Sequence, residues 1–69
     1  MKELTEKQQK VLDFMKRSIE SNGYPPSVRE IGEHFEISLK GAYDHLMAIK
    51  RKGYVEIKSN KSRAIRIVK

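Results

Sequence analysis

The stretch from Ser38 to Gly53 combines long cations, hydrogen-bonding groups and small residues, and these types suit contact with a polar partner. On a helix, which turns about 100° per residue, Lys40 and Asp44 lie on the same face. A lysine ammonium can donate to O6 and N7 of guanine or to a phosphate, and a carboxylate can accept from N4 of cytosine. Gly41, between them, would let the helix backbone approach another surface closely. This chemistry is recognition of base edges rather than catalysis.

Two neighbours extend this candidate surface. Ser38 can cap the helix by accepting from first-turn amides, and those amides can in turn meet a phosphate. Tyr43 lies about 40° from Leu39 around the helix, so half-buried packing and a contact with a base or sugar are equally good interpretations.

Metal, cofactor and catalytic sites are not expected in these 69 residues. The sequence contains no phosphate-binding glycine loop, no Cys-x-x-Cys and no His-Glu-x-x-His. His34 and His45 fall on different predicted helices, and Glu30, one turn before His34, is more typical of a hydrogen-bonded pair than of a ligand set. No nucleophile, base and oxyanion hole can be assembled, so we predict that this stretch is not an enzyme.

Three capped helices are predicted to position the candidate residues. Thr5 and Gln8 form a capping box that starts a helix at Glu6, and Gly23 ends it after about Asn22. Its apolar stripe is Val11, Leu12, Met15 and Ile19, with Phe14 on one flank. The third helix begins after Ser38 and ends at Gly53, and its predicted core face is Leu39, Ala42, Leu46 and Ile49. Its opposite face carries Lys40, Gly41, Asp44, His45, Ala48, Arg51 and Lys52.

The second helix connects to the third by a very short turn. After the helix-breaking Tyr24-Pro25-Pro26, a second capping box, Ser27 to Glu30, starts a helix of about eight residues whose apolar positions are Val28, Ile31 and Phe35. Gly32 inside this helix predicts close approach of another backbone, for which the third helix is the nearest candidate. With only Glu36 and Ile37 before Ser38, the pattern predicts a helix-turn-helix over about residues 28–52, with Ile37 in the corner. The alternative is a three-helix bundle without a ligand.

The pattern changes to alternation after Gly53. Val55 and Ile57, then Ile65 and Ile67, are predicted to face the helices from two antiparallel strands joined by the turn-forming residues 59–62. The resulting hairpin, about residues 54–68, would be a wing. We therefore predict an α+β, mainly α, winged helix-turn-helix: three helices and a two-stranded antiparallel hairpin in one domain, residues 1–69.

Charge is concentrated in the C-terminal half. The chain has 15 Lys and Arg against 9 Asp and Glu, but residues 1–37 have a net charge of −1 and residues 38–69 of +7. Such a surplus favours nucleic acid, an anionic membrane surface or an acidic protein, or serves only solubility. No apolar run approaches the roughly 20 residues of a membrane span, so we expect a soluble, intracellular protein.

Several short segments along the chain resemble the N-terminal domain of the LexA repressor family. They are Leu4-Thr5, Gln8-Gln9-Lys10-Val11-Leu12, Gly23-Tyr24-Pro25-Pro26-Ser27, Arg29-Glu30-Ile31, Gly41-Ala42, His45-Leu46, Lys52-Gly53-Tyr54 and Ser62-Arg63-Ala64-Ile65. The resemblance implies a bacterial, cytoplasmic and nucleoid-associated repressor of SOS (DNA-damage) genes. It also implies that a homodimer binds double-stranded DNA at a pseudo-palindromic operator. In that family a C-terminal domain, not present in these residues, dimerises and cleaves itself with a serine-lysine dyad when RecA filaments assemble.

The resemblance also places the contacts to DNA bases. The base-reading positions of the family map to Ser38, Lys40, Gly41, Tyr43 and Asp44, although many relatives have Asn and paired Glu in this segment, so the operator sequence does not follow. Expected contacts to the DNA backbone are Ser27, Arg29, His45, Lys52, Lys58, Asn60, Lys61 and Arg63. Because the predicted core uses its apolar faces internally, we expect the isolated domain to be monomeric.

The sequence is also compatible with two other functions. One is that of a winged helix from another bacterial regulator, and longer flanking sequence would distinguish it from a LexA-like repressor by lacking the self-cleaving domain. The other is that of a winged helix that uses its basic face to bind an acidic protein, and such a domain would bind DNA without sequence preference.

Overall fold

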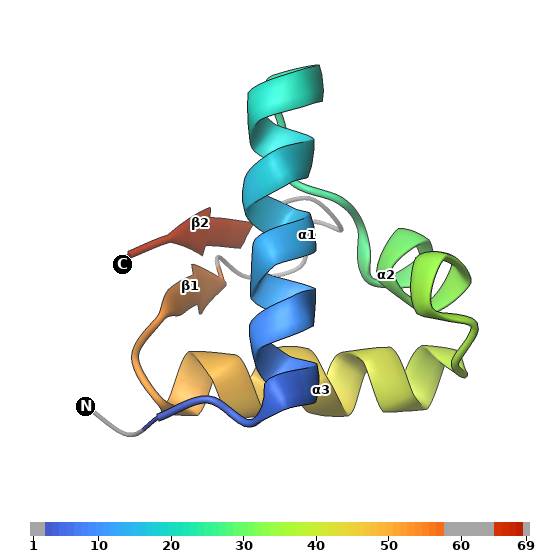
Figure 1. The fold of residues 1–69 in the computed structure, drawn as a ribbon, viewed down its shortest axis with the longest axis vertical. Helices are drawn as coiled ribbons and strands as arrows, with labels where there is room; N and C mark the ends of the chain where they lie inside the picture. The colour runs from blue at the N-terminus through green and yellow to red at the C-terminus, as the bar shows by residue number, and fades with distance from the viewer. Residues whose placement is uncertain (1–2, 58–64, 69) are drawn as a thin grey trace.

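A computed structural model describes residues 3–57 and 65–68 of the chain. The elements are helix α1 (Glu6–Asn22), helix α2 (Val28–Phe35), helix α3 (Leu39–Arg51), strand β1 (Val55–Ile57) and strand β2 (Ile65–Ile67). Helix α3 crosses one end of α1, with α2 on one side of α1 and the hairpin on the other (Figure 1). Three helices followed by an antiparallel hairpin confirm the predicted mainly helical, winged helix-turn-helix class.

The helix boundaries follow from local capping, as predicted. Both capping boxes are complete: Thr5 Oγ1 accepts from the Gln8 amide at 3.1 Å, and Ser27 Oγ accepts from the Glu30 amide at 3.1 Å. The reciprocal bonds, from the Thr5 and Ser27 amides to the side chains three residues on, are 3.0 and 2.8 Å. Gly23 ends α1 with a φ of 85°, which is the left-handed conformation expected of it.

One core joins all five elements. Its buried apolar side chains are Val11, Leu12, Met15, Ile31, Ala42, Leu46, Ile49, Val55 and Ile65. The prediction that Leu39 belongs to the core face of the third helix is wrong, because Leu39 is 57% exposed. The core begins one turn later, at Ala42, and the first turn of α3 lies at the rim of the core beside α2.

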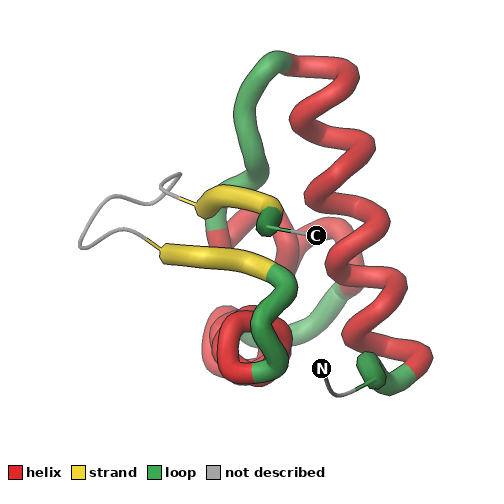
Figure 2. The backbone as a smooth tube through the Cα atoms, turned by 90° about the vertical axis from the view of Figure 1, so that its left-hand side faces the viewer, coloured by secondary structure: helices red, strands yellow, loops and turns green. Residues whose placement is uncertain are grey.

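The hairpin turns one face to the helices. Val55 pairs with Ile67 and Ile57 with Ile65 in an antiparallel register, and all four pack in or against the core, as predicted. On the outer face Glu56 lies opposite Arg66, and their side chains form an ion pair at 3.8 Å. Figure 2 shows the two strands side by side. The predicted turn at residues 59–62 lies outside the described residues.

None of the helices in the described part of the chain is long and apolar enough to cross a membrane.

Candidate nucleic-acid interface

The turn between α2 and α3 has a fixed geometry. The amide of Ile37 donates to the carbonyl of Gly32 at 2.9 Å, and the amide of Glu36 donates to the carbonyl of Glu33 at 3.4 Å. These are the two bonds of a Schellman motif, and Glu36 provides its left-handed residue with φ 55° and ψ 44°. Sequence reasoning missed this role of Glu36, because the left-handed position is usually glycine. The only signal for it was the two-residue length of the connection.

Gly32 lets the two helices come together at this turn. A Cβ built on Gly32 would lie 3.1 Å from the carbonyl oxygen of Ile37, 3.6 Å from that of Ser38 and 3.7 Å from Cβ of Ala42. The predicted close approach of another backbone is therefore confirmed, and the backbone is the turn leading into α3. The turn holds the start of α3 at a defined place relative to α2.

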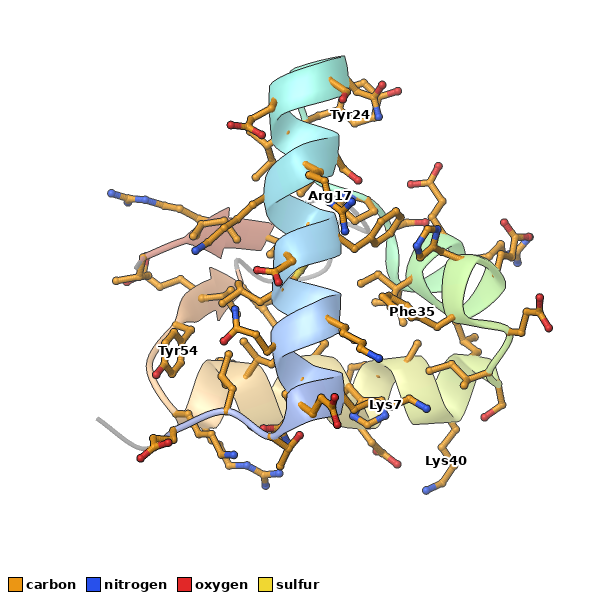
Figure 3. The ribbon with its side chains drawn as sticks, viewed as in Figure 1. Lys7, Arg17, Tyr24, Phe35, Lys40 and Tyr54 are labelled. Atoms are coloured by element: carbon orange, nitrogen blue, oxygen red, sulfur yellow. The ribbon has the colours of Figure 1, made fainter. Side chains whose placement is uncertain are left out.

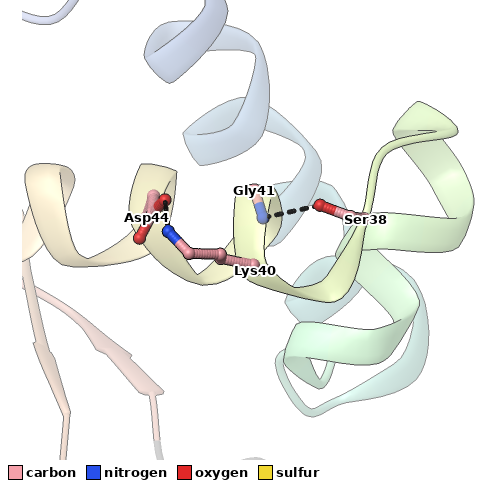
Figure 4. Close-up of polar contacts among 4 residues, drawn as sticks. All are labelled: Ser38, Lys40, Gly41 and Asp44. Atoms are coloured by element: carbon pink, nitrogen blue, oxygen red, sulfur yellow. Dashed lines mark hydrogen bonds and ion pairs between the residues drawn. The ribbon is translucent and has the colours of Figure 1, made fainter.

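The first two turns of α3 present Lys40 and Asp44 together. Ser38 Oγ accepts from the Gly41 amide at 3.0 Å, as the predicted cap requires, and Nζ of Lys40 lies 3.5 Å from Oδ2 of Asp44 (Figure 4). The two charged side chains are 86% and 63% exposed. Lys40 points away from the body of the protein in Figure 3. Both charges are thus available to a partner at the end of α3 nearest the turn.

Gly41 occupies a different side of α3. A Cβ at this position would lie 3.3 Å from Ser38 Oγ and 3.8 Å from Cβ of Ile37, so this side of the helix faces back toward the turn. The Gly41 amide is already bonded to Ser38. The small size of Gly41 therefore serves packing of the turn, beside the exposed face that carries Lys40 and Asp44.

Tyr43 and Leu39 lie on the flank of α3 next to the start of α2. Tyr43 is 51% exposed, and together with Val28, Leu39 and Lys40 it lines an open hollow. About half of the tyrosine surface is thus free to contact a partner. Sequence reasoning left this choice open for Tyr43, and it assigned Leu39 to the core and not to the exposed surface.

The residues expected to contact a DNA backbone are placed differently from one another. Ser27 caps α2, Arg29 is exposed in its first turn, and His45 is half-buried on α3. Lys52 has partners within the protein: its Nζ donates to Oε1 of Gln8 at 2.6 Å and to the carbonyl of Glu3 at 3.0 Å. The predicted wing contacts Lys58, Asn60, Lys61 and Arg63 lie outside the described residues.

His34 packs among aromatic rings. Its ring stacks on Phe14, with centroids 4.0 Å apart and an interplanar angle of 13°, and meets Phe35 edge-on at 4.7 Å. The three rings join α1 to α2, which sequence reasoning did not foresee. Residues 3–57 and 65–68 contain no group of three His, Cys, Asp or Glu side chains that could hold a metal ion.

Three capped helices, a tight turn before the last of them and a hairpin after it define a winged helix-turn-helix. Within that class the chain belongs to the LexA DNA-binding domain family, whose family model matches residues 1–64. The LexA repressor of Thermotoga maritima is 58% identical over all 69 residues, and those of Leptospira interrogans and Leptospira biflexa are 54% and 52% identical. The chain spans about a third of the length of these relatives, 34–35%.

Proposed function

We propose that this chain is the operator-binding domain of a LexA-like transcriptional repressor of SOS genes. The observation that carries the proposal is the pair Lys40 and Asp44, exposed side by side at the start of a helix whose place is fixed by a tight turn. Membership of the LexA DNA-binding domain family supports it. In this proposal residues 28–52 are the helix-turn-helix, residues 54–68 are the wing, and together they form one domain.

In the proposed complex α3 enters the major groove with its N-terminus first. Lys40 and Asp44 exchange their mutual ion pair for base edges, guanine O6 and N7 for the ammonium and cytosine N4 for the carboxylate. Tyr43 contacts a base or sugar beside them. Ser38 and Gly41 lie at the capped end of the helix, where the backbone approaches the groove and meets a phosphate.

The remaining contacts reach the phosphates on either side of the groove. Ser27 and Arg29 would do so from the start of α2, and His45 from α3. Lys52 would contribute at the far end of α3 while its ammonium stays bonded to Gln8. Lys58, Asn60, Lys61 and Arg63 would contact the backbone from the wing. Such contacts fix the position of the domain on DNA and supply affinity that is independent of sequence.

The whole repressor, as we propose it, acts as a homodimer on a pseudo-palindromic operator in the bacterial nucleoid. The relatives are about three times as long as this chain, which leaves room for a further domain in the whole protein. Dimerisation, self-cleavage by a serine-lysine dyad and the response to RecA would belong to that domain.

The proposal is tested by replacing Lys40 and Asp44 individually with alanine. Each variant should change which operator variants are preferred, by about 1 to 3 kcal/mol at one base pair, because each side chain reads one base edge. Binding is measured on a panel of single-base operator variants selected from randomised duplexes. The matched control is Lys16→Ala, which removes an exposed cation from α1.

Equal loss of affinity for every duplex in the Lys40 and Asp44 variants would contradict base reading by these residues. A wild-type chain that binds all duplexes alike, with no footprint on any of them, would favour a protein-binding winged helix instead.

A further inference from the structure

An apolar surface continues the charged face of α3. Leu39 and Tyr43, 57% and 51% exposed, line an open hollow together with Val28 and Lys40. In the described part of the chain the other exposed large hydrophobic residues, Tyr24 and Val68, lie outside α3. The apolar flank is therefore a local feature of the place where α2 and α3 both begin.

Folding does not explain why Leu39 is a large apolar residue. Within α3 the buried core starts at Ala42, one turn later, and more than half of the Leu39 surface stays exposed to water. Burial stabilises a protein in proportion to the apolar area removed from water, so this leucine contributes less than a fully buried core leucine such as Leu46. Helix capping at this end is the task of Ser38, which makes no demand on its neighbour.

The hollow has a defined position relative to the proposed DNA-reading side chains. Lys40, which lines it, also forms the ion pair with Asp44 on the exposed face. On its other side the hollow is bounded by Val28, the first residue of α2, next to the cap Ser27 and the exposed Arg29. It thus lies between the residues proposed to read bases and those proposed to meet phosphates.

We propose that this hollow receives the C5-methyl group of a thymine, and that Leu39 determines specificity for that base. The inference rests on the proposed function. In the major groove the methyl group is the apolar mark that distinguishes thymine from the other unmodified bases. Leu39 supplies the aliphatic contact, Tyr43 and Val28 form the walls, and Lys40 remains free for the neighbouring base or phosphate.

The inference predicts that one thymine in each half-site is read through its methyl group. Replacing it by uracil leaves base pairing and hydrogen-bonding groups unchanged and removes only the methyl. The expected loss of affinity is about fourfold for substitution in one half-site, the change given by losing contact with one methyl-sized group. Leu39→Ala should bind the thymine operator more weakly than wild type does. It should also bind the uracil and thymine operators equally, because the thymine methyl group then has no leucine side chain to contact.

The experiment scans thymine-to-uracil substitutions through one half of a selected operator, with wild type, Leu39→Ala, Leu39→Met and Val68→Ala. Leu39→Met should retain the loss of affinity caused by uracil, since methionine keeps an apolar side chain of similar size. Val68→Ala is the matched control, because Val68 is an exposed apolar residue, 49% exposed, outside this surface, and it should behave as wild type. Circular dichroism checks that each variant is folded.

Two results would overturn the role of Leu39. In the first, uracil weakens binding of Leu39→Ala and of wild type equally at every position. In the second, uracil weakens wild-type binding at no position. Either result would leave the proposed function intact as long as operator variants are still discriminated. If the wild-type chain binds all duplexes with the same affinity, the proposed function itself is refuted.

Discussion

Glu36 holds a backbone conformation that suits glycine better than glutamate. Its φ of 55° lies in the left-handed region, where the Cβ of an L-residue is crowded by the backbone. Within residues 3–57 and 65–68 it is the one non-glycine residue with positive φ. The turn tolerates this strain because the amides of Glu36 and Ile37 are bonded back to α2.

The Glu36→Gly variant should therefore be more stable than the Glu36→Ala variant. Both changes remove the carboxylate from the end of α2, but only glycine removes the Cβ. We expect the free energy of unfolding of the glycine variant to exceed that of the alanine variant by about 1 kcal/mol. Urea denaturation with its midpoint and slope measures the difference. A more stable alanine variant would mean that Glu36 is not strained.

At the scale of elements, one side of the hairpin packs against the helices. Val55 and Ile65 are buried, and Ile57 and Ile67 pack against the core. The cations Lys58, Lys61 and Arg63 follow or precede these strands in sequence, where folding of such short strands does not require them. They can contact phosphates, or they can keep the edge of the hairpin from pairing with other chains.

The double variant Lys61→Ala with Arg63→Ala distinguishes these two roles. If both cations meet phosphates, the slope of log affinity against log salt should fall by roughly one to two units, with operator preference unchanged. Binding is titrated over a series of salt concentrations, with Lys16→Ala plus Arg17→Ala on α1 as the control pair. An unchanged slope in a folded double variant would leave the wing with a structural role.

The sequence predicted these elements well wherever local chemistry decides them. The start of α1 after Thr5 and of α2 after Ser27 depends on side chains three residues apart, and the end of α1 depends on the left-handed freedom of Gly23. Such signals are complete within one turn of helix. The length of α2 was predicted correctly from its cap and apolar spacing, and the pairing of the strands from the alternation of apolar residues along both of them.

What the sequence did not predict depends on residues distant in the chain. Leu39 has the spacing of a core residue, but the core reaches only to Ala42, and spacing alone contains no information about where a core ends. Lys52 was predicted on an outer face, yet its ammonium donates to Gln8 in the first turn of α1 and to the carbonyl of Glu3. At the candidate site the positions of Lys40 and Asp44 were predictable from one helix. The apolar hollow was not, because two helices form it.

At the scale of the whole molecule, the domain leaves little apolar surface for a permanent partner. Its exposed large hydrophobic residues in the described part of the chain are Tyr24, Leu39, Tyr43 and Val68, and they come from three separate regions. A stable dimer needs a buried surface of about 800 Å² on each partner, with an apolar centre.

We therefore expect the isolated domain to be a monomer and to bind a single half-site weakly. Two copies should bind tightly only when the duplex carries an inverted repeat. Sedimentation velocity at micromolar concentration, with and without duplexes carrying one or two half-sites, measures both states. A stable dimer in the absence of DNA would show that the domain contains its own dimer interface.

The bond between Lys52 and Gln8 joins residues that are 44 positions apart in the chain. It connects the end of α3 to the capping box of α1, so it can form only after the intervening helices have come together. Closing so long a loop is entropically costly, and we expect this bond to be absent from the folding transition state. Its contribution would then appear in the unfolding rate, and it would lengthen the lifetime of the folded domain without making the domain fold faster.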